Sequence, residues 1–575
     1  MYDMVIRNGT VHDGLGSEPR AVDVAIVDGR IELVGVLDEQ RVGDATEVVD
    51  ATGMLVTPGF VDAHTHYDGQ VTWDPYLAPS TLHGVTTIVA GNCGVGFAPC
   101  RPAERDWLIG LMEGVEDIPG TALHEGIDWE WETFPEYLDA LERTPLAIDV
   151  GTQVPHGAVR AYVMGERGPA HEVATADEIA DMKAVVREAI EAGALGFSTS
   201  RTIKHRDVRG VVTPSITAHA DELVGIATAL GELDAGVVQG ISDFGDFESE
   251  FELFRLMAEA SGRTTSITVE QQDAHPDWWR QLLHGITAAQ AAGLDMRGQV
   301  PPRATGVLMG LTATLNPFLF SPHYQSVARL PLDERVERLR DPELREAIIT
   351  DDVPELGLGT EIVTSWHKMF RLEDPPDYEP GSEKSFAGIA ERDGRRPQDV
   401  AYDAMLEDEG RALIYHPLFN YLPGDLSYVQ EMMEHPHTVM GLSDGGAHCG
   451  TICDASFPTT LIQHWGRDRT RGPKLPVEQL IRKQTSETAR LVGLRDRGVL
   501  APGYKADVNV IDFERVRPRR PTIVHDLPAG GRRLLQHADG YVATIVAGQV
   551  AFREGVPTGE LNGRLIRGAQ PAPAS

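Results

Sequence analysis

Apolar residues in the middle of the chain fall into short runs that alternate with longer segments of helical periodicity. Seven runs rich in Val, Ile and Thr predict strands, at 84–94, 146–157, 193–200, 235–243, 263–272, 294–303 and 438–446, and the apolar run before His64 supplies an eighth. Intervening segments such as 175–193 and 251–262 repeat apolar residues at helical spacing and end in Gly. This alternation indicates an α/β fold with parallel strands and crossover helices. Eight units favour a distorted (β/α)8 TIM barrel over a doubly wound sheet.

The two ends of the chain have a different pattern, in which apolar residues alternate around turn dipeptides. Asn8-Gly9 and Asp28-Gly29 interrupt such runs near the N-terminus, and "GYVATIVAGQVAF" repeats the style near the C-terminus. These patterns predict β-hairpins. We therefore expect a small β-sandwich formed by residues 1–56 and 490–556, and a barrel at 57–489 with an insertion at 310–435. The Gly-, Pro- and Ala-rich residues 557–575 predict a loosely packed tail.

Composition and charge exclude several classes of partner. The chain has 575 residues, with 42% hydrophobic and 24% charged residues, as is usual for globular enzymes. Its formal net charge of −36 argues against nucleic acid as a partner. Four cysteines in a chain of this length do not make a disulfide framework. Neither a signal peptide nor an apolar run of membrane-spanning length is present, so we expect a cytoplasmic protein without a membrane partner.

The segment "PGFVDAHTHYDG" places His64 and His66 one residue apart behind apolar residues. Residues i and i+2 of a strand face the same side, so both imidazoles would point into the barrel mouth, where active sites of such barrels lie. Neutral imidazoles bind zinc and similar metals. On spacing alone, two hydrogen-bonded histidines on a loop remain an alternative.

Two later motifs offer further chemistry at the same mouth. Cys93 in "GNCG" could ligate a metal as thiolate, although a lone cysteine in apolar surroundings is commonly inert. Asp444 in "GLSDGGAHC" follows an apolar run, and its carboxylate could take a proton from metal-bound water. An aspartate that closes a turn is the alternative. A separate metal site at His448, Cys449 and Cys453 is disfavoured, because no second pair is evident.

Together these motifs resemble a known family. The order "TPGFVDAHTHYDG", "GNCG", "SDGG" and "PGYKADV" is similar to the amidohydrolase superfamily, and within it to the N-acyl-D-amino-acid deacylase (D-aminoacylase) group. The resemblance implies a metal-dependent hydrolase with His64, His66 and Cys93 as metal ligands. In it, Cys93 takes the metal-bridging place that relatives fill with a carbamylated lysine, and Asp444 is the general base. The segment 154–160 resembles a family segment that places His156 near the mouth.

The chain also departs from this family. Two further ligand histidines are expected at the ends of the fifth and sixth strands, but Gln239, Gly240, Gln271 and Gln272 stand there. Amides are poor zinc ligands compared with His or Cys. One metal held by His64, His66, Cys93 and Asp444, a more loosely bound metal, and no metal therefore all remain open. We favour the first of these, with zinc as the ion. His275 could substitute for a missing histidine if its loop folds back.

Residues that bind the substrate are less clearly marked. Arg303 and Arg201 follow strand candidates, and either guanidinium could clamp a substrate carboxylate. A structural salt bridge is the alternative for each. With His156 and His275 they make four candidate substrate-binding residues.

The function predicted from these features is metal-assisted hydrolysis of an amide bond in a small molecule, most simply an N-acyl-D-amino acid. A cyclic amide or imide hydrolase is the alternative among enzymes. A catalytically inactive barrel that acts as a binding subunit is the alternative of another class. The acyl group, the preference for D or L substrates, and a homo-oligomeric state stay open.

Overall fold

A computed structural model describes residues 1–574, apart from the side chain of residue 39. Its centre consists of parallel strands in two sheets. The first has the order β6-β7-β8 and the second the order β17-β13-β12-β11-β10-β9. Their bounds are β6 Phe60–Asp62, β7 Val85–Ala90, β8 Asp149–Thr152, β9 Val154–Pro155, β10 Gly196–Arg201, β11 Val237–Ser242, β12 Thr265–Thr268, β13 Met296–Val300 and β17 Thr438–Met440.

The two sheets meet at both of their edges. Only Gln153 separates β8 from β9, and a parallel bridge joins Thr65, beyond β6, to Gly445, beyond β17. Each of the eight runs predicted as a strand contains one, with β8 and β9 together inside 146–157. The carboxyl ends of all these strands therefore lie on one face of the α/β core, which is where ligands bind in such folds.

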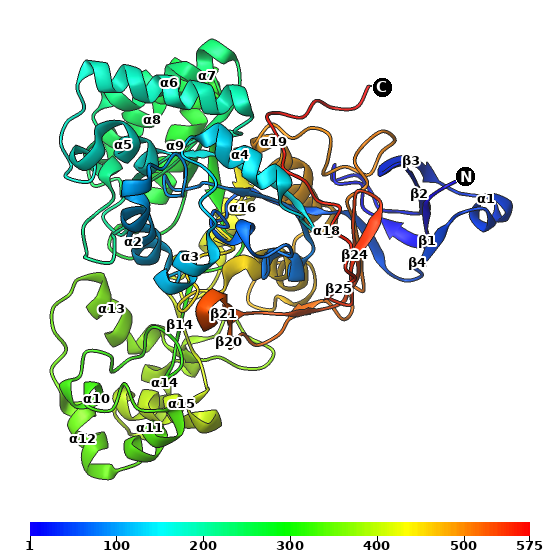
Figure 1. Cartoon of the computed structure of the whole chain (residues 1–575). Helices are drawn as coiled ribbons and strands as arrows, with labels where there is room; N and C mark the ends of the chain where they lie inside the picture. Colours follow the sequence, from blue (N-terminus) through cyan, green and yellow to red (C-terminus); the bar gives the residue numbers. More distant parts are fainter. Residues whose placement is uncertain (575) are drawn as a thin grey trace.

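Helices between the strands cover the sheets and form the lobe at the top of Figure 1. Those of the first half of the core are α2 Arg105–Glu116, α3 Gly120–Gly126, α4 Phe134–Arg143, α5 His156–Met164, α6 Ala176–Ala192, α7 Ala220–Leu233, α8 Phe247–Ser261 and α9 Trp278–Ala291. α6 illustrates the local rules, because Thr175 and Glu178 form a capping box at its start and Gly193 ends it with φ 118°. Those residues bracket the segment that the sequence predicted to be helical.

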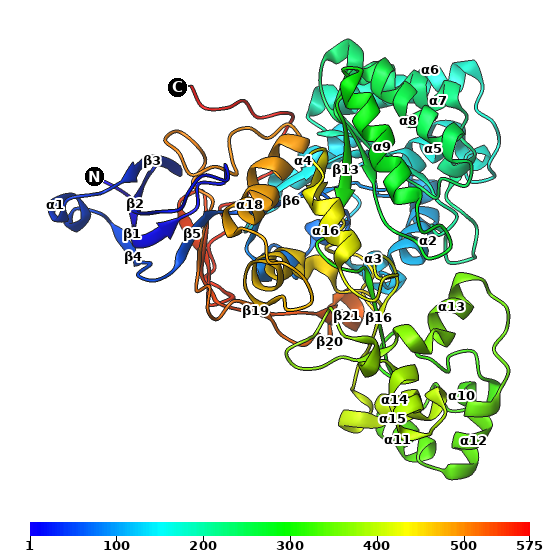
Figure 2. The same ribbon diagram turned by 180° about the vertical axis from the view of Figure 1, so that it is seen from behind.

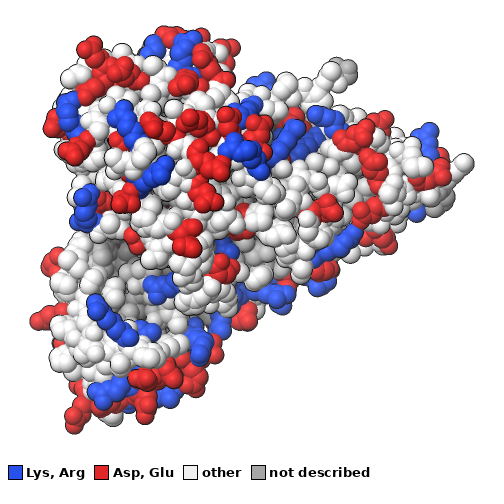
Figure 3. Space-filling model, in the orientation of Figure 1, with Lys and Arg blue, Asp and Glu red and all other residues white. Residues whose placement is uncertain are grey.

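A second lobe, at the bottom of Figures 1 and 2, is formed by residues 306–417, which overlap the segment predicted as an insertion. It contains β14 Gly306–Met309, α10 Pro322–Gln325, α11 Leu332–Leu339, α12 Pro342–Thr350, α13 Leu358–Thr364, β15 Phe370–Arg371, α14 Phe386–Asp393, α15 Pro397–Gly410 and β16 Ile414–Pro417. The lobe has an apolar core of its own, which includes Phe386, Val400 and Tyr402. Figure 3 shows the surface hollowed between the lobe that carries α2 and the lobe that carries α13.

Both chain ends join in one mixed sheet of nine strands, in which β5 and β18 pair antiparallel. Its strands are β1 Met4–Val11, β2 Arg20–Val27, β3 Arg30–Gly35, β4 Glu47–Asp50, β5 Leu55–Pro58, β18 Val508–Ile511, β23 Tyr541–Val546, β24 Gln549–Arg553 and β25 Val556–Pro557. Asp28-Gly29 makes the predicted hairpin turn between β2 and β3. The predicted turn at Asn8-Gly9 is wrong, since both residues lie within β1. They form a bulge there, and a Cβ on Gly9 would come 2.4 Å from Val56 Cγ2.

The C-terminal segment differs from the expected loose tail. Gly563 and Leu565 form bridges to Leu146 and Val150, and Gln570 pairs with Leu494. Leu565 and Ile566 are buried. This segment closes over the start of β8 and is part of the packed structure. Among the described residues, no helix combines the length and apolarity needed to cross a membrane.

Candidate metal centre and active site

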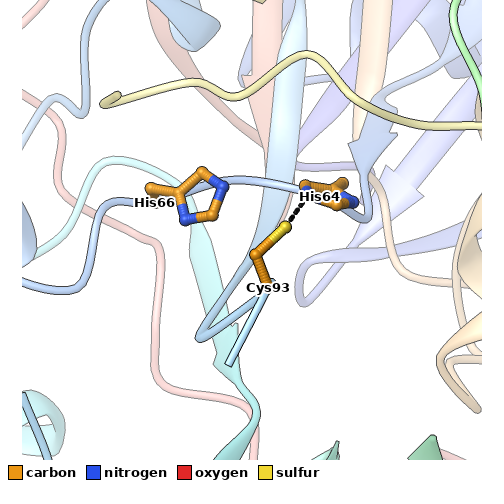
Figure 4. A group of neighbouring side chains, drawn as sticks. All are labelled: His64, His66 and Cys93. Carbon is orange, nitrogen blue, oxygen red and sulfur yellow. Dashed lines mark hydrogen bonds between the residues drawn. The ribbon is translucent and has the colours of Figure 1, made fainter. Parts of the chain in front are cut away.

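The segments that follow β6 and β7 bring His64, His66 and Cys93 together. Their candidate ligand atoms all lie within 4.8 Å of one another, and all three side chains are buried. His64 Nε2 is 3.2 Å from Cys93 Sγ. Figure 4 shows the sulfur between the two imidazole rings. We call these residues the three-ligand group.

Asp444 lies against both imidazoles of this group. Its Oδ1 is 3.4 Å from His64 Nε2 and 3.6 Å from His66 Nε2. Its backbone N–H donates to the His64 carbonyl at 3.2 Å, which fixes the loop after β17 to the segment after β6. Asp444 and Cys93 both have left-handed backbones, with φ 49° and 54°. Non-glycine residues adopt such conformations at a cost, and they gather at functional sites.

Gln299 on β13 orients the His64 ring. The Gln299 amide nitrogen donates to Ser266 Oγ at 2.9 Å, so its carbonyl oxygen faces His64 Nδ1 at 2.6 Å. His64 therefore carries its proton on Nδ1 and presents the lone pair of Nε2 to Cys93 and Asp444. Burial lowers the pKa of His64 to about 4, so its imidazole is neutral near pH 7. A neutral ring with a fixed tautomer is what a metal ligand requires.

His66 lies between two carboxylates. Its Nδ1 is 3.3 Å from Glu116 Oε1, at the end of α2, and its Nε2 faces Asp444. Burial alone would lower the pKa of His66, but Glu116, Asp444 and Cys93 together raise it well above its ordinary value. His448 completes the cluster, with Nε2 3.7 Å from Glu116 Oε2 and 3.8 Å from Asp444 Oδ2. This arrangement favours positive charge at the centre of the site.

Gln239 on β11 holds the Cys93 loop. Its Oε1 accepts a hydrogen bond from the Cys93 backbone N–H at 2.8 Å. The Gln239 side chain is buried, and its Nε2 has no hydrogen-bond partner among the described residues. Burial raises the pKa of the Cys93 thiol to about 11. A bound cation deprotonates a coordinating thiol, so this pKa describes the group without its ion.

The residues present fit a metal ion of the zinc type. Two imidazoles and a thiol are the donors that zinc prefers, and the outer ring nitrogen of His64 has the hydrogen-bond acceptor that such ligands use. His66 Nδ1 and Glu116 Oε1 are buried near each other without forming a well-directed hydrogen bond. The neighbouring carboxylates supply negative charge that a cation would balance.

The two arginines proposed to bind substrate are engaged with protein carboxylates. Arg201 pairs with Glu250, Nε to Oε2 and Nη2 to Oε1, both at 2.7 Å. Arg303 is buried, with Nη1 2.8 Å from Asp454 Oδ1 and its guanidinium over the Tyr378 ring. Each arginine therefore forms a structural salt bridge, which was the alternative to substrate binding. Few of their N–H groups remain to bind a substrate carboxylate.

The two histidines proposed to bind substrate differ from each other. His156 is buried, with Nδ1 2.9 Å from Thr199 Oγ1 and Nε2 2.8 Å from Glu222 Oε1, so both ring nitrogens are occupied. His275 is exposed to solvent. Its ring stacks on Trp278, with ring centroids 3.4 Å apart, and lines a narrow cavity. Of the four proposed residues, His275 is the one whose side chain faces open space.

The glutamines in the places expected for histidines also differ. Gln239 supports Cys93, as described above. Gln271 faces the insertion: its N–H donates to Asn420 Oδ1 at 2.7 Å, and its Oε1 accepts from the Leu422 N–H at 3.1 Å. Gln272 pairs with His275 in a short bridge. The loop that carries His275 is thus held by Gln272 and the insertion.

Several residues of the site escaped the sequence analysis. Glu116 and Gln299 lie in a helix and a strand whose patterns give no hint of a functional role. His448 stands four residues after Asp444 and could have been found from that spacing. Lys204 and Glu270 line the same narrow cavity as His275. Burial raises the pKa of Glu270, and the nearby Lys204 ammonium opposes this shift.

Comparison with known proteins gives matches over almost the whole chain. The amidohydrolase family model matches residues 47–552. D-aminoacylase from Alcaligenes xylosoxydans xylosoxydans is 27% identical, covering 98% of this chain and 97% of the relative. N-acyl-D-glutamate deacylase from the same organism is also 27% identical, with 98% and 96% covered. An uncharacterized protein of Mycobacterium bovis is 29% identical, with 96% and 92% covered.

Solved structures have the same fold. A crystal structure of D-aminoacylase matches with a TM-score of 0.65 at 24% identity, covering 99% of this chain and 100% of that chain. N-acyl-D-glutamate deacylase from Bordetella bronchiseptica, solved with zinc and a phosphonate inhibitor, matches with a TM-score of 0.65 at 24% identity, with 98% and 99% covered.

Proposed function

This chain belongs to the amidohydrolase family and is thus a hydrolase of carbon–nitrogen bonds, and we propose that it removes the acyl group from an N-acyl-D-amino acid. Two relatives of nearly equal length, named for the deacylation of D-amino acid derivatives, support this substrate class. The observation that carries the proposal is the contact of Asp444 with both imidazoles of the three-ligand group.

We propose that His64, His66 and Cys93 hold one zinc ion, with Asp444 beside it. When bound there, zinc supplies a Lewis acid that lowers the pKa of water and polarises a carbonyl oxygen. Gln299 and Gln239 hold two of the ligands in place. Of the two carboxylates beside these ligands, Asp444, with 20% of its side chain exposed, is the one that substrate and solvent can reach, since Glu116 is 1% exposed.

Asp444 then acts as the general base and acid. Its Oδ1 is positioned at the histidine pair, and its carboxylate accepts the proton of the attacking water. It returns this proton to the leaving nitrogen as the amide carbon–nitrogen bond breaks. Burial alone would raise the pKa of Asp444, but His66, His64 and His448 lower it well below its ordinary value. The carboxylate is therefore ionised near pH 7, as a general base must be.

The amino acid part of the substrate is proposed to enter the narrow cavity lined by Lys204, Glu270 and His275. The Lys204 ammonium lies 4.7 Å from the centre of the Phe419 ring and 3.5 Å from Asp243 Oδ1. It supplies positive charge for a substrate carboxylate, and the rings of Trp278 and Phe244 in the cavity wall supply apolar surface. The hollow between the two lobes (Figure 3) is proposed as the route from solvent to this cavity.

The architecture that supports this site is proposed to be a closed (β/α)8 barrel at 57–489. The strand order and the bridge from Thr65 to Gly445 support closure. Residues 1–56 and 490–556 are proposed to form the second, β-sandwich domain around the mixed sheet. A cytoplasmic location and a homo-oligomeric state stay predictions.

Kinetics with matched substrates tests the proposed function. The purified zinc-loaded protein should hydrolyse N-acetyl-D-amino acids, while the L-enantiomers and a cyclic amide such as dihydrouracil serve as contrasts. Asp444→Asn should abolish turnover, keep the melting temperature and retain bound zinc. Wild-type turnover by this variant would remove Asp444 from the mechanism. Faster hydrolysis of the cyclic amide than of any N-acetyl-D-amino acid would replace the proposed substrate class.

A further inference from the structure

A cavity lined by arginines lies at the end of the parallel strands opposite to the three-ligand group. Thr264 and Asp295 come directly before β12 and β13, Pro436 lies two residues before β17, and all three form part of the cavity wall. The metal-site residues follow the other ends of their strands. The cavity has a volume of about 490 Å³, within the range of pockets that bind small organic ligands. The helices α18 Val477–Arg482 and α19 Thr488–Leu491 mark this region in Figure 1.

Positive charge concentrates here in a chain whose formal net charge is −36. The lining includes five arginines and two acidic residues: Arg297, Arg482, Arg490, Arg495, Arg497, Asp295 and Glu487. Three of the arginines are paired. Arg297 Nε is 2.7 Å from Asp295 Oδ1, Arg482 Nε is 2.7 Å from Glu487 Oε1, and Arg497 is bound by Asp149 and Asp496. These pairs use both acidic residues of the lining.

The other two arginines, Arg490 and Arg495, have no such partner. Both are exposed, and neither guanidinium makes an ion pair or a hydrogen bond with any residue among 1–574. The backbone at this point is nevertheless fixed. Arg495 N–H donates to the Gln570 carbonyl at 2.8 Å, and Gly493 N–H donates to the Arg490 carbonyl at 3.1 Å. Two uncompensated guanidinium groups therefore extend from a held segment into one cavity.

The remaining wall is partly apolar and includes Leu491, Val499 and Tyr504. A ligand that matches this surface has two negative charges at one end and an apolar body at the other. The planar guanidinium binds phosphate and carboxylate through two parallel hydrogen bonds. We propose that this cavity binds a small organic phosphate monoester, whose dianionic phosphate lies between Arg490 and Arg495. Dicarboxylates carry the same two negative charges, but they have two oxygens on each carboxylate carbon where a phosphate monoester has three terminal oxygens on one phosphorus.

The test is a binding measurement on the intact zinc-loaded protein. Phenyl phosphate is titrated by isothermal calorimetry at an ionic strength of about 0.15 M, where unspecific surface attraction is largely screened. The variants are the pair Arg490→Gln with Arg495→Gln, and Arg329→Gln as the control. Arg329 is likewise exposed and without a side-chain partner among the described residues, but it lies in the insertion. Succinate is titrated in parallel as the dicarboxylate.

We expect phenyl phosphate to bind the wild-type protein and Arg329→Gln with equal affinity. Each lost arginine should weaken binding roughly tenfold or more, because hydrogen bonds between charged groups are removed. No binding to the wild-type protein would overturn the proposal. Equal affinity in the double variant would do the same, since it would place the ligand at another site such as the zinc. Binding of succinate but not phenyl phosphate, lost in the double variant, would overturn the phosphate assignment.

Discussion

The hydrogen bond between Gln299 and His64 offers the sharpest test of how the metal ligands are held. In Gln299→Met, a side chain of similar length replaces the carboxamide, so packing changes little. His64 Nδ1–H then loses its acceptor at 2.6 Å, in a place where the ring is fully buried. Ser266 loses a donor at 2.9 Å but keeps the Val238 carbonyl as a partner at 3.4 Å. The loss therefore falls mainly on the His64 ring.

The expected size of the effect follows from two considerations. A buried donor without a partner costs about 1–3 kcal/mol. Loss of the residue that orients a ligating histidine weakens metal binding roughly 10- to 100-fold, which corresponds to about 1.4–2.7 kcal/mol. Without Gln299, the His64 proton can also move to Nε2, where it blocks the lone pair that faces Cys93. We expect zinc to bind Gln299→Met roughly 10- to 100-fold more weakly.

The assay is competition for zinc between the metal-free protein and a fluorescent chelator. Gln299→Glu is the rescue variant, because a carboxylate accepts the same proton and should keep the affinity near the wild-type value. Gln536→Met is the matched control. Gln536 is also buried, and its amide nitrogen donates to Tyr378 and to the Arg519 carbonyl, so its loss should lower stability without changing the zinc affinity. An unchanged zinc affinity in folded Gln299→Met would refute the role assigned to Gln299.

Two further changes probe the supports of the site and of the fold. Gln239→Met leaves the buried Cys93 N–H without its acceptor and should lower the free energy of unfolding by about 1–3 kcal/mol, as measured by urea denaturation; unchanged stability with unchanged zinc affinity would contradict this. Asp149→Asn leaves the buried Arg497 and Lys505 without their shared carboxylate and should cost about 3–5 kcal/mol. Burial alone would raise the pKa of Asp149, but Lys505 and Arg497 lower it from 3.8 to about 2. Its stabilisation is therefore complete above about pH 5 and is lost as the pH falls from there through about 2. The free energy of unfolding of Asp149→Asn should accordingly fall less steeply with acid than that of the wild-type protein. Equal slopes for the two proteins would argue against the ion pairs.

The strands were predictable because each one is short, buried and bounded by turn residues. β7 is buried along its whole length, and its sequence "VTTIVA" is rich in β-branched residues, which favours a strand over a helix. Turn dipeptides were less reliable. Asp28-Gly29 turns the chain, whereas Asn8-Gly9 sits in β1 because β5 approaches too closely for any side chain at Gly9. That approach depends on a strand more than forty residues away, which local patterns do not contain.

The same distinction separates the site residues that sequence reasoning found from those it missed. His64, His66, Cys93 and Asp444 follow strand ends, and parallel topology alone brings such positions to one face. Glu116 reaches the site from the end of α2, and nothing in an amphipathic helix indicates what its last residue will meet. The contact arises because α2 packs beside the loop after β17, where the His448 N–H donates to the Glu116 carbonyl.

The number of zinc ions bound should distinguish this site from one in which histidines replace the glutamines. Gln239 Oε1 accepts from the Cys93 N–H, and Gln299 Oε1 faces the His64 ring, so neither carboxamide oxygen remains for a second ion. Gln271 is bound to the insertion. We therefore expect elemental analysis to give about one equivalent of zinc, in protein purified without added metal and again after dialysis against excess zinc. Saturation at two equivalents would show that these glutamines do not replace a second set of ligands. Less than a tenth of an equivalent, with no uptake on dialysis, would remove the metal from the mechanism.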